Sequence, residues 1–287
     1  MTFTKVKRLP QSCSTLDSFW AFLAGRLPVN SYQYHALAVG VFLLAAITSA
    51  RAESPLTVVA GEGSDGEIMV GMDVVIYTDG IDDVRHFMGN RFFAGGHDGA
   101  LGPVTVIGVG PPECGNTTLS FAPKLPDGFF AAYSDDTRFA ALSAAPELHD
   151  AVVRGVDGPI RSAGGIGEVV PYAIWRFKLP GSSDPLVFAT IRTPNYRDNS
   201  WGDPGGFDAI ALMRQDGESL SVLDVKVTLA HVTSLSNDVD LMAVAINPST
   251  GGTDLFVRYQ SHEYREFIAY DIGQGTFTPR LHSECSM

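Results

Sequence analysis

One loop of this chain concentrates residue types that bind hard cations. Between Arg197 and Asp208 the sequence has three carboxylates and one carboxamide among several glycines, namely Asp198, Asn199, Asp203 and Asp208. Calcium takes about six to eight oxygen ligands from carboxylates, carboxamides and backbone carbonyls, and a glycine-rich loop can bring such oxygens together. The preferred interpretation is a polar turn whose Asp and Asn side chains cap backbone groups, with no cofactor. The alternative is a calcium site in this loop.

The same loop also predicts a place for an organic ligand. Trp201 lies between the acids of the loop, and an exposed aromatic ring there can stack on a sugar ring. We expect Trp201 and Asp203 to contact such a ligand.

Catalysis by carboxylates is the alternative chemistry. Two acids suffice for glycoside hydrolysis, and sequence alone does not show their separation. The loop carboxylates open to this role are Asp79, Asp98, Asp198, Asp203 and Asp208.

Other catalytic signatures are missing from the sequence or incomplete. There is no Gly-x-Ser-x-Gly elbow, no His-Glu-x-x-His zinc motif and no phosphate-binding Gly-Lys-Thr loop. His86 and the pair His97-Asp98 offer a general base or a zinc ligand, without the spacing that would make either specific.

The two cysteines beyond residue 52 predict one disulfide bond. Cys114 and Cys285 enclose about 170 residues, and in an oxidising compartment such a bridge stabilises the fold by about 4–5 kcal/mol in the chain-entropy description. The alternative is two free thiols.

The elements that must position these residues are short strands. Apolar runs alternate with polar residues and are separated by Gly, Pro, Asp and Asn, as in Leu223–His231. The expected strands are Leu56–Ala60, Glu67–Tyr77, Val104–Val109, Thr118–Phe121, Gly128–Tyr133, Val169–Leu179, Leu186–Arg192, Phe207–Leu212, Leu220–Ala230, Asp240–Ile246, Asp254–Tyr259 and Phe267–Asp271.

One short helix is expected, over Ser143–Gly155, with Ser143 as its cap. Many short strands and one helix predict an all-β fold, a β-sandwich of jelly-roll type, with a degenerate β-propeller as the alternative.

A local resemblance also favours a sandwich. The run Val225–His231 followed by Asp238–Gly251 is similar to the centre of proprotein-convertase P domains and the related bacterial pre-peptidase C-terminal domains. The resemblance covers about 30 residues. It implies a β-sandwich module with an accessory or binding role, because such modules carry no catalytic residues.

The first 52 residues have the three parts of a secretory signal. A basic region precedes the apolar run Ala36–Ile47, and Ala50-Arg51-Ala52 follows with the small-x-small pattern of a cleavage site. The run of 12 apolar residues is short for a membrane span, which needs about 20. We predict cleavage after Ala52 and a secreted or periplasmic domain over residues 53–287. The Gly- and Pro-rich stretch 155–166 is either a boundary between two subdomains or a long loop.

Charge narrows the partners of the expected mature chain. Residues 53–287 carry 15 basic and 31 acidic side chains, a net charge of −16. Such a surface repels phosphate backbones, so nucleic acid and anionic membrane are poor partners. The sequence favours an exported, non-catalytic binding or accessory domain for a glycan, a protein or a cell-envelope component. The alternatives are a secreted hydrolase that uses loop carboxylates and a structural protein of the envelope.

Overall fold

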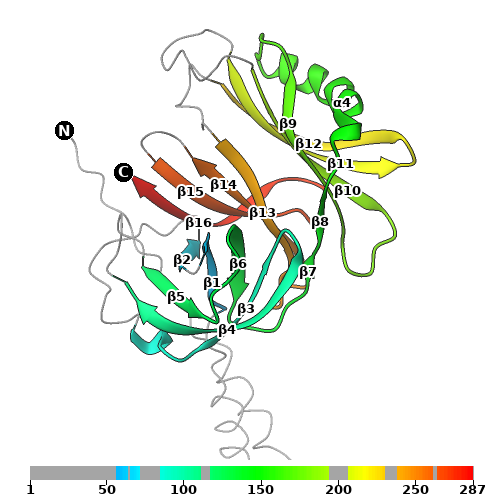
Figure 1. Ribbon diagram of the computed structural model, residues 1–287. Coiled ribbons are helices and arrows are strands. Elements are labelled where there is room, and N and C mark those ends of the chain that lie inside the picture. The colour runs from blue at the N-terminus through cyan, green and yellow to red at the C-terminus, as the bar shows by residue number, and fades with distance from the viewer. Residues whose placement is uncertain are drawn as a thin grey trace, which may run out of the picture. The chain divides into compact units, whose positions relative to one another are not determined.

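The predicted all-β, sandwich-like class is confirmed. The computed structural model describes residues 56–63, 65–71, 85–110, 117–193, 206–229, 238–260 and 264–286, all within the compact unit Pro55–Met287. Antiparallel strands dominate this part of the chain, together with one α-helix and two 3₁₀ turns (Figure 1).

The first six strands close into an antiparallel barrel. They follow the order β1-β6-β3-β4-β5-β2, and β2 pairs with β1 to complete the ring. The rings of Phe92, Phe121 and Phe130 meet edge to face inside it. The strands are β1 Val58–Glu62, β2 Asp65–Gly71, β3 Arg91–Gly96, β4 Gly99–Val109, β5 Thr118–Ala122 and β6 Phe129–Tyr133, with the 3₁₀ turn η1 Arg85–Phe87 before β3.

A second group of strands continues from the barrel. β16 pairs with the end of β2 through Gly71 and Leu281, and the order β16-β15-β14-β13-β7 follows. One face of this sheet packs against the barrel through an apolar cluster that includes Tyr133, Phe256 and Phe267. The bounds are β7 Phe139–Ala140, β13 Asp238–Ile246, β14 Thr253–Gln260, β15 Tyr264–Asp271 and β16 Thr278–Ser286.

A separate five-stranded sheet, in the order β12-β11-β10-β9-β8, forms the other half of the sandwich. Phe188 and Leu212 of this sheet pack against Leu255 and Tyr270 of the first. The bounds are β8 Leu142–Ala144, β9 Val170–Lys178, β10 Pro185–Arg192, β11 Phe207–Asp216 and β12 Ser219–Leu229.

Helix α4, His149–Ser162, covers the other face of the five-stranded sheet. It follows the 3₁₀ turn η2, Pro146–Leu148, and buries Val152, Val156 and Ile160 against that sheet. The helix begins six residues later than expected, because Ser143 lies in β8. Neither Gly nor Pro within its sequence ends it early, so it runs through most of the stretch 155–166.

Candidate functional site

The predicted calcium and sugar loop lies largely outside the described residues. Asp198, Asn199, Trp201 and Asp203 are all outside them. Asp208 is described: it is buried, 6% exposed, near the start of β11. The calcium site and the Trp201–Asp203 contact therefore stay predictions.

Asp208 belongs to a polar link between the two sheets of the sandwich. Its cross-strand partner is Arg192, whose guanidinium carbon lies 3.9 Å from the centre of the Tyr172 ring. The Tyr172 hydroxyl donates to the carbonyl oxygen of Val239 at 3.0 Å and accepts from its N–H at 2.8 Å. Burial, with a smaller contribution from the charge of Asp208, raises the pKa of Tyr172. This arrangement fastens β9 to β13.

The predicted disulfide bond stays a prediction. Cys114 lies outside the described residues. Cys285 is in β16 opposite Arg265, and its side chain is also outside the described part.

The histidine–aspartate pair is positioned by the β3–β4 turn. The His97 Nε2 lies 2.5 Å from the carbonyl oxygen of Leu241, and the His97 ring lies 4.5 Å from the ring of Trp175. Asp98 is exposed. Asp79, another carboxylate that the hydrolase alternative could use, is outside the described residues. Within the described ranges there is no group of three or more His, Cys, Asp or Glu side chains placed to hold a metal ion. In this structure His97 connects the barrel to the sandwich.

A pocket lies where the barrel meets the first sheet of the sandwich. β2 and β16 share two register pairs among the described residues, and residues of β1, β2, β5 and β15 line the pocket. The cavity there measures about 250 Å³. We call it the seam pocket. Its lining residues are Gly61, Glu62, Asp65, Gly66, Glu67, Thr118, Arg265 and Phe267.

The inner wall of the seam pocket is a buried ion pair. The Glu67 side chain is 6% exposed and accepts hydrogen bonds from the Arg265 Nη2 and the Ser283 hydroxyl. These two strong donors compensate the charge of the carboxylate in a poorly solvated position. Within the described residues Nη2 is the one nitrogen of the Arg265 guanidinium that has an acceptor.

The outer wall is the hairpin between β1 and β2. Its turn carries two exposed carboxylates, Glu62 and Asp65, which are cross-strand partners. Asp65 accepts a hydrogen bond of 2.6 Å from Ser120, and Glu62 has no partner among the described residues. The lining of the pocket thus combines carboxylate acceptors from the β1–β2 hairpin with the guanidinium donors of Arg265.

Two glycines let the hairpin close tightly. A Cβ at Gly61 would lie 2.1 Å from the carbonyl oxygen of Asp65, and one at Gly66 would lie 2.6 Å from Val59 Cγ1. Both positions therefore need glycine, because a side chain at Gly66 would enter the barrel core and one at Gly61 would meet the partner strand of the hairpin.

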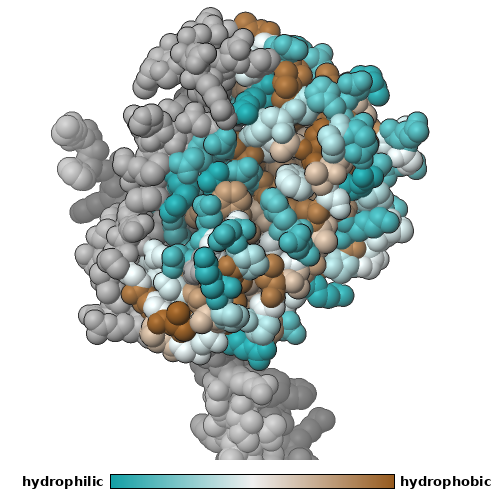
Figure 2. Space-filling view, viewed as in Figure 1, coloured by the Kyte–Doolittle hydropathy of each residue, from teal (hydrophilic) through white to brown (hydrophobic). Residues whose placement is uncertain are grey.

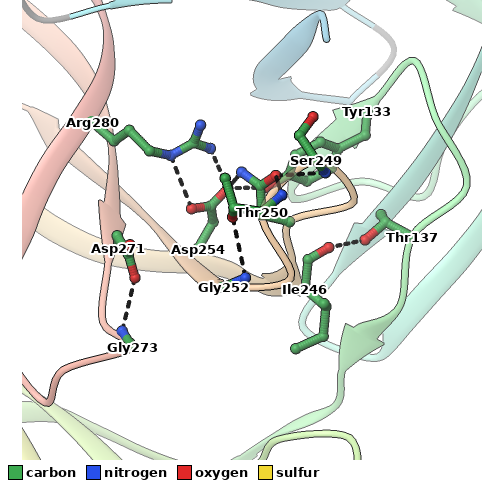
Figure 3. Close-up of polar contacts among 11 residues, drawn as sticks. Tyr133, Thr137, Ile246, Ser249, Thr250, Gly252, Asp254, Asp271, Gly273 and Arg280 are labelled. Atoms are coloured by element: carbon green, nitrogen blue, oxygen red, sulfur yellow. Dashed lines mark hydrogen bonds and ion pairs between the residues drawn. The ribbon is translucent and has the colours of Figure 1, made fainter.

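A second buried network strengthens the same junction. Asp254, 1% exposed, accepts hydrogen bonds from the Tyr133 hydroxyl, from Asn247 Nδ2 at 2.9 Å and from the Arg280 guanidinium (Figure 3). Burial and then the charge of Asp254 raise the pKa of Tyr133 well above its usual value. The network joins β6 of the barrel to β14 and β16 of the sheet.

A pair of carboxylates lies on the sandwich side of the same sheet. Glu266 of β15 and Glu284 of β16 are cross-strand partners, and Lys226 of β12 also acts on Glu266. Burial, then the charge of Glu284, raises the pKa of Glu266 to about 7, against the opposing effect of Lys226. Sequence reasoning missed this pair, because only the strand register brings the two residues together.

The surface of the described residues is mixed in character. Figure 2 shows hydrophilic residues over much of one face, with smaller apolar areas between them. The large apolar side chains that are exposed in the described part of the chain are Met88, Ile107 and Ile166. None of the described helices is long and apolar enough to cross a membrane.

Comparison of the chain with protein-family models, with curated proteins and with solved structures gives no match.

Proposed function

We propose that this chain is an exported, non-catalytic domain that binds a ligand in the seam pocket. The observation that carries the proposal is the pocket itself, a cavity of about 250 Å³ whose lining includes the acceptors Glu62 and Asp65 and the guanidinium donor of Arg265. Binding sites typically combine a concave shape with a few convergent polar groups. The leader pattern of residues 1–52 supports export.

The calcium and disulfide predictions belong to the same proposal. Calcium in the loop 198–208 and a Cys114–Cys285 bond both suit an extracellular or periplasmic setting. Either would stabilise the domain.

The pocket is tested with a pair of matched double variants. Glu62→Ala/Asp65→Ala removes both exposed carboxylates of the β1–β2 hairpin, and Asp216→Ala/Glu218→Ala does the same at the β11–β12 hairpin. Ligands found on arrays of glycans, envelope polymers and exported proteins are then measured by calorimetry. We expect the first variant to lose at least about tenfold in affinity, or about 1.4 kcal/mol.

The control variant is expected to bind as the wild type does. All four carboxylates are exposed, so we expect the free energy of unfolding of both variants to lie within about 0.5 kcal/mol of the wild-type value. Equal binding by the two variants would contradict a site in the seam pocket. Turnover of a bound ligand would contradict a non-catalytic role.

A secreted hydrolase is the second candidate function. The observation that favours it is the Glu266–Glu284 pair, because a carboxyl whose pKa is about 7 can act as a general acid near neutral pH. In that case Glu266→Gln abolishes hydrolysis while the protein stays folded.

A further inference from the structure

We propose that the seam pocket takes a neutral, polyhydroxylated ring, such as one sugar unit, and that Glu62, Asp65 and Arg265 bind its hydroxyl groups. The inference rests on the proposed function, because it names the ligand class of the same pocket.

The hydrogen-bonding groups of the pocket suit hydroxyls. Ionised carboxylates such as Glu62 and Asp65 only accept hydrogen bonds, whereas the guanidinium of Arg265 only donates them. A hydroxyl group does both. Neighbouring hydroxyls on one ring can therefore donate to the hairpin and accept from Arg265 Nη1, which has no acceptor among the described residues.

The charges of the pocket disfavour an ionic ligand. The one deeply buried carboxylate, Glu67, is already compensated by Arg265 and Ser283. The remaining two, Glu62 and Asp65, are exposed and solvated, so a cation gains little from them. An anion that approaches the guanidinium meets these same carboxylates, and like charges in contact are unfavourable.

The size of the seam pocket also favours a single sugar ring as its ligand. The cavity of about 250 Å³ is smaller than the range of about 300–1,000 Å³ typical of drug-sized ligands, so it suits a single small ring. Phe267 contributes an apolar part of the lining, and the guanidinium carbon of Arg265 lies 5.4 Å from the centre of its ring.

The test compares three probes that share one ring. The full chain, labelled with ¹⁵N, is titrated with glucose, with glucosamine as the cationic analogue and with glucuronate as the anionic analogue. We expect glucose to shift the amide signals of Gly61, Gly66 and Thr118, and to bind at least about threefold more tightly than either ion. Glu62→Ala/Asp65→Ala should abolish these shifts, and Asp216→Ala/Glu218→Ala should retain them.

Each outcome decides the inference. Tighter binding of glucosamine or glucuronate at the same amides overturns the ligand class and leaves the proposed binding function standing. Glucose shifts that survive in the hairpin variant place the sugar elsewhere and overturn the inference. If all three probes leave the pocket signals unchanged, the inference is also wrong, and the wider ligand screen decides the proposed function separately.

Discussion

At the scale of single residues, the described chain uses buried carboxylates in two different ways. Glu67 and Asp254 each receive an arginine and at least one further donor, so both charges are compensated at the junction of barrel and sheet. Glu266 instead faces a second carboxylate, Glu284, in a half-buried position. Burial and the charge of Glu284 disfavour the charged form of Glu266.

This difference predicts how stability depends on pH. The pKa of Glu266 is about 7 in the folded protein and about 4.5 when unfolded. Between these two pH values the native state therefore binds more protons than the unfolded state does. The contribution of Glu266 to the stability of the folded protein is fully present below pH 4.5 and is lost as the pH rises through 7. Glu266→Gln mimics the protonated form. At pH 8 we therefore expect its free energy of unfolding to be about 1–2 kcal/mol higher than that of the wild type.

Denaturant unfolding of both proteins between pH 4 and pH 8 measures this effect. The exposed Glu218→Gln serves as the control and should keep the pH dependence of the wild type. If Glu266→Gln also kept it, Glu266 would not be the group that titrates.

At the scale of elements, the β1–β2 hairpin depends on space that only glycine leaves. A Cβ at Gly66 would lie 2.6 Å from Val59 Cγ1 and 2.9 Å from Phe130 Cζ, inside the barrel core. We expect Gly66→Ala to destabilise the protein by about 1–3 kcal/mol through overpacking. Gly110→Ala is the matched control, because its Cβ would meet Thr118 at an ordinary 3.5 Å. Thermal unfolding of both variants checks the prediction, and equal midpoints would contradict it.

Local sequence predicted many of these elements and missed the strands β3, β7, β8 and β16. The alternation around Leu223–His231 predicted β12 within a few residues, since a half-buried strand has a period of two. β16 was missed: Pro279 and several polar residues hide its pattern, and it forms because β15 and β2 lie on either side of it.

The site was less predictable than the strands. The string Gly61-Glu-Gly-Ser-Asp-Gly66 has the residues of a tight turn, and that signal could have predicted the hairpin. Nothing local indicates that Arg265, 198 residues further along, pairs with Glu67. The loop that the sequence offered for calcium or a sugar, 198–208, is described only from residue 206.

At the scale of the whole described domain, the barrel and the sandwich share one interior. An apolar cluster that includes Met69 and Phe256 spans the junction, and the Tyr133–Asp254 contact and the Glu67–Arg265 ion pair cross it. A barrel that separated from the sheet would expose this apolar surface, take Glu67 away from Arg265 and Ser283, and remove the Tyr133 hydroxyl from Asp254. These consequences are costly, because exposed apolar area and broken buried ion pairs each destabilise a partly unfolded state.

We therefore expect barrel and sandwich to unfold together in one cooperative transition. Hydrogen exchange of the native protein measures this directly, because amides that open only by global unfolding report the same free energy. Core amides of β4 in the barrel and of β10 in the sandwich should give equal values, and Asp254→Asn should lower both by about 3 kcal/mol, the order of magnitude for a broken buried pair. Faster exchange confined to β4 would contradict a shared transition. In that event the seam pocket would lie between two units that open independently, and a ligand bound there would raise the stability of their junction more than that of either unit.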